Sequence, residues 1–158
     1  MGVLVRLEPE QVAVHWALIK NAVLASLPPW TFVKQSKEEI AASIYHAMLR
    51  RQMDVWFYPN GVIPPKHVLV TCEIYDPYTE TKSLCVYANY SVPAFVQGEK
   101  EQSPLITMGE WVRGLKELER YGRGLECQQV IAYMEDERLR ELMKRLGFEE
   151  QYCFTKVL

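Results

Sequence analysis

The feature that most constrains the fold is a pair of extended segments joined by a turn. In residues 67–75, side chains at alternate positions form two different faces, as expected of a strand. One face carries Val68, Val70, Cys72 and Ile74, and the other carries Leu69, Thr71, Glu73 and Tyr75. Turn-forming residues follow at 76–79, and residues 83–90 are again rich in branched and aromatic side chains. The sequence therefore predicts an antiparallel hairpin over residues 67–90.

Strands and helices alternate on both sides of this hairpin. A capping box of Ser36 and Glu39 begins a helix that continues to Met48. The other expected strands are 3–7, 54–58, 129–134 and 151–157, and the other expected helices are 9–27, 136–146 and one that begins at Ser103 or Thr107 and is ended by Gly122 and Gly124. The order β-α-α-β-β-β-α-β-α-β predicts a single α/β domain over residues 1–158. Its mixed sheet should carry helices on both faces.

Length and charge limit the classes of function. A chain of 158 residues fits one domain. Its formal net charge of -2 excludes a generally basic surface, so we expect no nucleic-acid partner. No apolar run approaches the roughly 20 residues that span a bilayer, and the chain does not open on a segment typical of a secretion signal. We therefore expect a cytoplasmic protein without a membrane partner.

The cysteines and histidines show no metal-ligand spacing, so we predict no metal site. They lie at Cys72, Cys85, Cys127 and Cys153, and at His15, His46 and His67. Cys72 and Cys85 fall on the two strands of the predicted hairpin and could face each other, which makes a disulfide geometrically possible. In an intracellular protein we expect free thiols instead.

Two segments resemble a known fold superfamily. Residues 141–148, Glu-Leu-Met-Lys-Arg-Leu-Gly-Phe, are similar to the end of the last helix of Gcn5-related N-acetyltransferases, the GNAT superfamily. Residues 70–77 and 84–87 resemble the central hairpin of short GNAT-like proteins of tailed bacteriophages. The order of elements agrees with this resemblance over residues 3–157. It implies a GNAT-like domain, with acetyl-CoA as the cofactor and an amine as the acyl acceptor.

The resemblance also implies where acetyl-CoA binds. In the superfamily, two neighbouring parallel strands splay apart, and here they lie near residues 87 and 131. The pantetheine arm pairs with the first strand, which corresponds to Tyr87, Ala88 and Asn89. The pyrophosphate lies on the N-terminus of the following helix, which corresponds to Thr107, Met108 and Gly109, because free N–H groups and the helix dipole favour an anion.

The sequence departs from the superfamily in its pyrophosphate loop. The segment 94–104 contains one glycine, Gly98, where the superfamily has a glycine-rich pattern. Glu99 and Glu101 add charge of the wrong sign, and Pro104 removes one N–H group. We therefore expect acetyl-CoA to bind weakly or not at all.

A second departure concerns catalysis. Where many members have a tyrosine that protonates the departing thiolate, this chain has Met143, which has no transferable proton. Tyr133 and Tyr152 could replace it. Glu73 is the candidate base, since it interrupts an apolar strand. The alternatives are that Glu73 lies on a partly solvated face of the sheet or pairs with Lys82 across the hairpin.

Two functions are therefore expected from the sequence. The first is an N-acyltransferase that works mainly by holding a thioester and an amine together, with the carbonyl polarised by a strand N–H near Ala88. The second is a GNAT-shaped protein without catalysis that binds protein partners within a larger assembly. Because of the phage-like hairpin, the assembly expected in the second case is a virus particle, or the protein is a phage accessory protein in the host cytoplasm.

Overall fold

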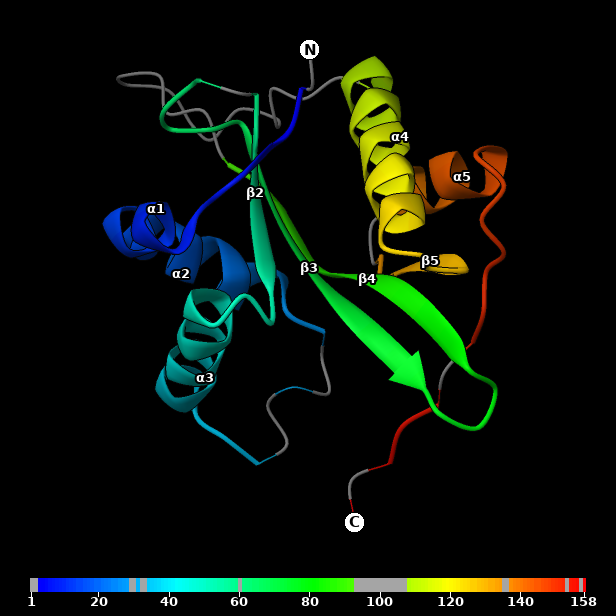
Figure 1. The fold of residues 1–158 in the computed structure, drawn as a ribbon, viewed down its shortest axis with the longest axis horizontal. Coiled ribbons are helices and arrows are strands. Elements are labelled where there is room, and N and C mark those ends of the chain that lie inside the picture. Colours follow the sequence, from blue (N-terminus) through cyan, green and yellow to red (C-terminus); the bar gives the residue numbers. More distant parts are fainter. Residues whose placement is uncertain are drawn as a thin grey trace.

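A computed structural model describes residues 3–28, 31, 34–59, 61–92, 108–134, 137–152, 154–156 and 158. Its centre is a five-stranded sheet in the order β1-β2-β3-β4-β5 (Figure 1). The strands are β1 (Val5–Arg6), β2 (Asp54–Tyr58), β3 (His67–Asp76), β4 (Thr81–Ser91) and β5 (Gln129–Ala132). The first four pair antiparallel, whereas β4 and β5 pair parallel. The predicted mixed sheet and its central hairpin are therefore confirmed.

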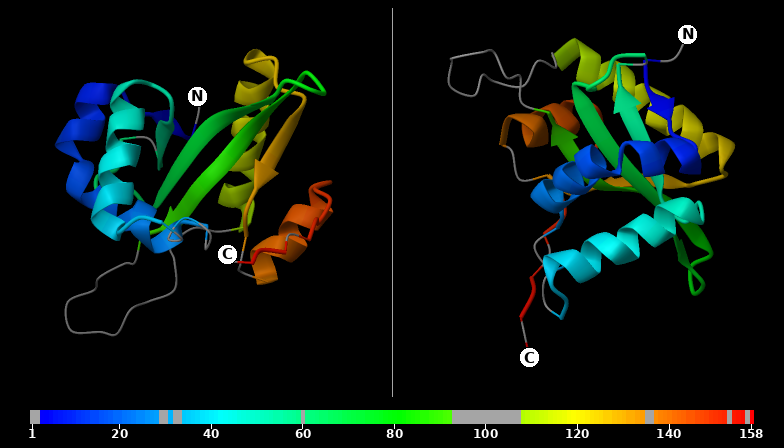
Figure 2. Two further views of the ribbon diagram at one scale, coloured as in Figure 1. Left: turned by 90° about the horizontal axis from the view of Figure 1, so that it is seen from below. Right: turned by 90° about the vertical axis from the view of Figure 1, so that its left-hand side faces the viewer.

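Helices cover both faces of the sheet, as predicted (Figure 2). The helices are α1 (Pro9–Val14), α2 (Trp16–Ser26), α3 (Lys37–Leu49), α4 (Met108–Gly124) and α5 (Glu137–Arg145). The first three lie on one face, and α4 and α5 lie on the other. None of these helices is long and apolar enough to cross a bilayer, as judged over the residues that the structure describes.

Apolar side chains of α1, α2 and α3 form the core on one face of the sheet. Ile19, Val23 and Ile44 are buried there against strand residues such as Phe57. The capping box that begins α3 is present in both directions: Ser36 Oγ accepts from the N–H of Glu39 at 3.3 Å, and Glu39 Oε2 accepts from the N–H of Ser36 at 2.8 Å. The beginning of this helix is thus encoded within four residues of sequence.

The single helix predicted over residues 9–27 is divided at His15. The backbone of His15 has φ -98° and ψ 14°, outside the helical range, and it ends α1 and precedes α2. The His15 ring lies 5.5 Å from the Phe57 ring, measured between centroids. A contact with a strand of the sheet therefore accompanies a break that the apolar periodicity did not indicate.

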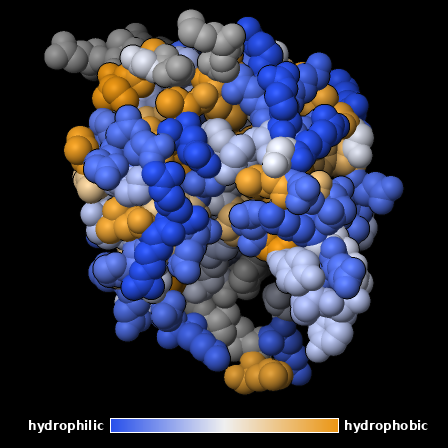
Figure 3. Space-filling model, in the orientation of Figure 1, coloured by the Kyte–Doolittle hydropathy of each residue, from blue (hydrophilic) through white to orange (hydrophobic). Residues whose placement is uncertain are grey.

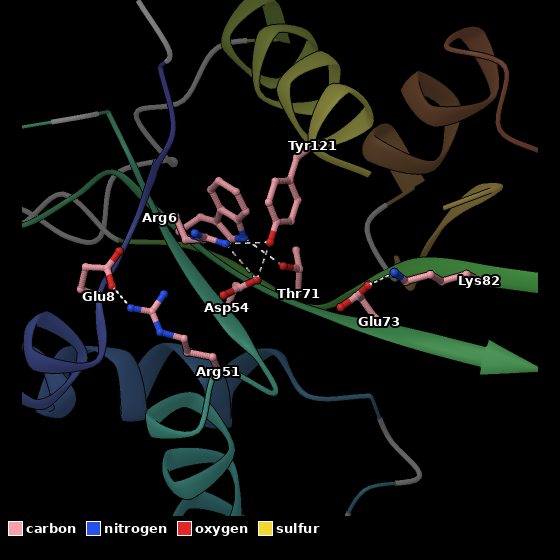
Figure 4. A network of polar contacts seen from close by, with 9 residues as sticks. Arg6, Glu8, Arg51, Asp54, Thr71, Glu73, Lys82 and Tyr121 are labelled. Carbon is pink, nitrogen blue, oxygen red and sulfur yellow. Dashed lines mark hydrogen bonds and ion pairs between the residues drawn. The ribbon is translucent and has the colours of Figure 1, made fainter. Parts of the chain in front are cut away.

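Polar contacts fix α4 on the sheet. The carboxylate of Glu117 accepts from the N–H groups of Val3 and Leu4 at 2.5 and 3.0 Å. One turn later, the Tyr121 hydroxyl donates to Asp54 Oδ2 at 2.8 Å and accepts from Arg6 at 2.9 Å (Figure 4). Burial and the bond to Asp54 raise the pKa of Tyr121. These contacts tie α4 to the first two strands.

The predicted strand over residues 151–157 is wrong. Of the described residues in this segment, none belongs to a strand. Gly147, with φ +89°, ends α5, and Glu150 then forms ion pairs with Arg140 and Lys144 of that helix. Glu150 is thus held against α5, and the described residues that follow it do not pair with the sheet.

His67 is a buried histidine at the start of β3. Its Nδ1 lies 3.0 Å from Ser91 Oγ, and its ring packs edge-on against Trp111 with centroids 4.9 Å apart. Its Nε2 has no hydrogen-bond partner among the described residues. Burial lowers the pKa of His67 to about 4. The folded protein therefore keeps this imidazole neutral.

The neutral state of His67 predicts a pH dependence of stability. Because the folded pKa of His67 lies below the value of 6.5 for an unperturbed imidazole, the unfolded chain binds a proton first as the pH falls. The free energy of unfolding should decrease by about 1.4 kcal/mol per pH unit between pH 6.5 and 4, in total by up to about 3 kcal/mol. Urea denaturation across this range measures it.

Two variants separate His67 from other groups that titrate at low pH. His67→Gln should reduce the stability at pH 7 and flatten the profile between pH 6.5 and 4. His46→Gln removes an exposed imidazole on α3 and should keep the wild-type profile. Equal slopes for the wild type and His67→Gln would contradict a neutral, buried His67.

Candidate active site

The two parallel strands separate where the resemblance implied that they should. β4 pairs with β5 only over Ser83–Val86, opposite Gln129–Ala132. β4 then continues to Ser91, whereas β5 ends at Ala132. From Tyr87 onward, the edge of β4 that faces away from β3 therefore has no partner strand among the described residues. This opening is the centre of the candidate site.

A β-bulge explains why the strands part. The register of β4 against β3 passes from Ala88, opposite Val70, to Val86, opposite Thr71. Tyr87 is the extra residue between them, and a bulge bends the strand that contains it. Val86 is also the last residue of β4 that pairs with β5. The bend therefore begins at the position where the parallel pairing stops.

The bulge also reverses which face of the sheet the side chains of β4 occupy. Leu84 and Val86 pack in the core beneath α4, whereas Ala88 packs in the core of α1, α2 and α3. Residues spaced by two would share a face in a regular strand. Further along, Asn89 Nδ2 lies 3.3 Å from Met134 Sδ, which follows β5. Side chains thus link the two strands beyond the point where their backbones part.

A cavity of about 960 Å³ adjoins this opening. It surrounds β5 and is bounded by α5 and by the chain that follows α5. Its walls include Tyr87, Ile131, Tyr133, Met143 and Tyr152. In the space-filling view the surface is hollowed between the turn of the β3–β4 hairpin and the C-terminal end of the chain (Figure 3). The volume lies within the range of small-molecule sites.

The predicted base, Glu73, is paired across the hairpin. Its carboxylate lies 2.6 Å from Lys82 Nζ, which also donates to the carbonyl of Leu125 at 2.8 Å (Figure 4). The hydrogen bond to Glu73 raises the pKa of Lys82. Glu73 is not among the residues that line the cavity. The pairing weighed as an alternative is therefore present, and the role of Glu73 as a base stays a prediction.

The two predicted acids line the same cavity but differ in exposure. Tyr133 directly follows β5 and is half-buried, whereas the side chain of Tyr152 is 80% exposed. Met143, at the position of the usual tyrosine, is buried in the wall. The structure thus brings Tyr87, Tyr133 and Tyr152 to one cavity. Among these three tyrosines, only Tyr133 is both partly buried and placed at the end of β5.

The residues predicted to receive the pyrophosphate lie apart from this cavity. Met108 and Gly109 are exposed at the start of α4 and do not line it. Thr107 and the segment 94–104 lie outside the described residues. Glu110, in the first turn, accepts from the Tyr58 hydroxyl at 2.6 Å and lies 3.7 Å from Lys66 Nζ. Burial and the bond to Glu110 raise the pKa of Tyr58 to about 12.

Sequence reasoning missed the bulge at Tyr87 and the fact that residues 148–152 form part of the cavity wall. The spacing of Leu84, Val86 and Ala88 predicts that the three side chains share one face of the sheet, so it does not indicate a bulge. The charges of Glu150, Arg140 and Lys144 were the available indication that the C-terminal segment would follow α5.

Known structures share this architecture. A predicted acetyltransferase from Clostridium acetobutylicum with acetyl-CoA has a TM-score of 0.64 at 11% identity, covering 98% of this chain and 94% of that one. A ribosomal-protein-alanine N-acetyltransferase from Brucella melitensis has 0.62 at 9%, covering 98% of both chains. An aminoglycoside N-acetyltransferase in complex with CoA has 0.59 at 13%, covering 97% and 92%. No protein-family model and no curated protein matches the chain.

These similarities extend over nearly the whole chain and include the mixed sheet with helices on both faces. The protein therefore has the GNAT fold, as the order of its elements indicated.

The separation of the strands can be tested by amide hydrogen exchange. Over Ser83–Val86 the amides of β4 face either β3 or β5, so all of them should be protected. Over Tyr87–Ser91 the amides that face away from β3 should exchange at least about tenfold faster than those that face it. NMR-detected exchange resolves the two sets, and uniform protection along β4 would contradict the opening.

Proposed function

We propose that the protein is an N-acetyltransferase that binds acetyl-CoA between β4 and β5 and transfers its acetyl group to an amine. The observation that carries the proposal is the bulge at Tyr87, since beyond it the edge of β4 beside the cavity has no partner strand within the part of the chain that the structure describes. The acetyltransferase complexes with acetyl-CoA and CoA among the similar structures support it.

The described residues fit part of acetyl-CoA. An extended amide arm such as pantetheine pairs with a strand edge, and β4 offers one over Tyr87–Ser91. The first-turn N–H groups of Met108 and Gly109 are exposed and could bind an anion. When bound, acetyl-CoA would supply an acetyl group activated as a thioester.

The chain's own groups would then position the acyl carbonyl and transfer protons. A backbone N–H near Ala88 would donate to the acyl carbonyl oxygen and stabilise the charge that develops there. The Tyr133 hydroxyl would donate its proton to the leaving sulfur. Glu73 would accept a proton from the amine only after releasing Lys82, because the ion pair occupies its carboxylate.

We expect weak affinity for acetyl-CoA. Glu110 contributes a negative charge within the first turn of α4, although Tyr58 and Lys66 partly compensate for it. The residues 94–104 supply a single glycine and two glutamates to the loop before that helix. A diphosphate would therefore gain little there.

The second candidate function is a GNAT-fold protein that binds other proteins without catalysis, as a component of a phage particle or as a phage accessory protein in the host cytoplasm. Two observations favour it. Met143 has no proton to donate, and the carboxylate of Glu73 forms an ion pair with Lys82. In this case neither acetyl-CoA nor an amine acceptor would be required.

Calorimetric titration with acetyl-CoA and desulfo-CoA distinguishes the two functions. We expect both ligands to bind with a Kd between about 10 μM and about 1 mM, which corresponds to roughly 4–7 kcal/mol of binding free energy. The absence of binding at millimolar ligand, together with co-sedimentation in a multi-protein assembly, would overturn the acetyltransferase and support the second candidate. A Kd near 1 μM would refute the expectation of weak pyrophosphate binding and would remain consistent with an acetyltransferase.

A matched pair of variants tests the proton donor. Tyr133→Phe should lower the turnover of acetyl-CoA with a small amine by about a hundredfold while leaving the affinity for desulfo-CoA unchanged. Tyr152→Phe makes the same chemical change at an exposed position in the same cavity and should retain wild-type turnover. Equal turnover of the two variants would remove Tyr133 from the mechanism.

A further inference from the structure

Two thiols face each other at the end of the sheet that carries the candidate site. Cys72 on β3 and Cys85 on β4 are direct partners in the antiparallel register. The pairs on either side, Thr71 with Val86 and Glu73 with Leu84, fix their positions. We propose that Cys72 and Cys85 form a reversible disulfide, so that this hairpin is a redox modification site for low-molecular-weight disulfides such as oxidised glutathione.

The Cα spacing of the paired strands is compatible with the bond. Directly opposed residues of an antiparallel pair have Cα atoms about 4.5 or 5.5 Å apart, and disulfides span about 4.4–6.8 Å. The side chains of opposed residues lie on the same face of the sheet. For Cys72 and Cys85, this is the face opposite Leu84 and Val86, which pack beneath α4. Oxidation therefore requires rotation of the two side chains and a small approach of the strands, because opposed Cβ atoms lie about 4.5–5.5 Å apart and those of a disulfide about 3.5–4.5 Å.

The surroundings make the pair accessible and distinguish it from the third described cysteine. Both thiols are half-buried, and Cys85 lines the cavity beside Tyr87. Cys127 packs in the core beneath α4, on the other face of the sheet. Cys153 lies outside the described residues. Among the described cysteines, the geometry thus selects one pair.

The contact between the thiols differentiates their roles. A hydrogen bond from Cys85 lowers the pKa of Cys72, and the same contact together with burial raises the pKa of Cys85. Cys72 is therefore the thiol that forms a thiolate more readily, and the thiolate is the attacking species in disulfide exchange. Cys85 is placed to resolve the mixed disulfide.

The exchange balances in two steps. The thiolate sulfur of Cys72 attacks one sulfur of oxidised glutathione, the S–S bond of the reagent breaks, and one glutathione leaves as a thiolate that takes up a proton. Cys85 then loses its proton, and its sulfur attacks the Cys72 sulfur of the mixed disulfide, which releases the second glutathione. The protein loses two electrons, which reduce the reagent to two thiols.

Non-reducing peptide mapping in glutathione buffers tests the proposal. In the Cys127→Ser/Cys153→Ser background, oxidation should consume both remaining thiols, link the peptides that contain Cys72 and Cys85, and lower the mass by two hydrogen atoms. Dithiothreitol should restore both thiols. Retention of both thiols in excess oxidised glutathione, or a stable glutathione adduct as the main product, would overturn the proposal.

A measurement on the reduced, unmodified chain gives an independent test. Phenylarsine oxide bridges two adjacent thiols, so it should bind the wild type and the Cys127→Ser variant and fail to bind Cys72→Ser and Cys85→Ser. Circular dichroism would verify that the variants are folded. Equal binding to Cys72→Ser and the wild type would show that the two thiols do not act together, and would contradict the proposal without reference to acetyl-CoA.

Discussion

The bulge at Tyr87 is the constraint on which the candidate site depends. It inserts one residue into β4 between two correctly paired stretches of the hairpin, and it lies where the pairing of β4 with β5 ends. A regular strand would present Leu84, Val86 and Ala88 to one core, whereas the bulge divides them between two. The bulge therefore directs Ala88 to the core of α1, α2 and α3, and beside the cavity it lies where an edge of β4 has no partner strand among the described residues.

Partly buried polar contacts add to the apolar packing that holds α4 on the sheet. Glu117 binds the backbone of the N-terminal segment, and Tyr121 connects the helix to Arg6 and Asp54. At the beginning of the helix, Glu110 binds Tyr58. These contacts fix the helix whose N-terminus would receive a diphosphate, and they place a carboxylate in its first turn. Glu110 thus adds a negative charge to the end of the helix at which the helix dipole favours an anion.

Local patterns in the sequence predicted much of the fold. The alternation at 67–75 and the capping box at Ser36 correspond to structure formed within a few residues, and both are confirmed. The division at His15 and the course of the chain after Gly147 were not predicted. At both places the structure shows a contact between segments that the sequence pattern does not pair, His15 with Phe57 and Glu150 with Arg140 and Lys144. The charges of these three residues were visible in the sequence, but the ion pairs between them were not.

The sequence by itself determined the hairpin, the beginning of α3 and most of the order of elements that agrees with the GNAT fold, because backbone sterics and short-range hydrogen bonds act between near neighbours. The tertiary structure decided the bulge at Tyr87, the separation of β4 from β5, and the pairing of Glu73 with Lys82. It also decided which tyrosines reach the cavity. These features depend on the registers of several strands at once and on side chains brought together from distant segments, and a one-dimensional pattern does not contain that information.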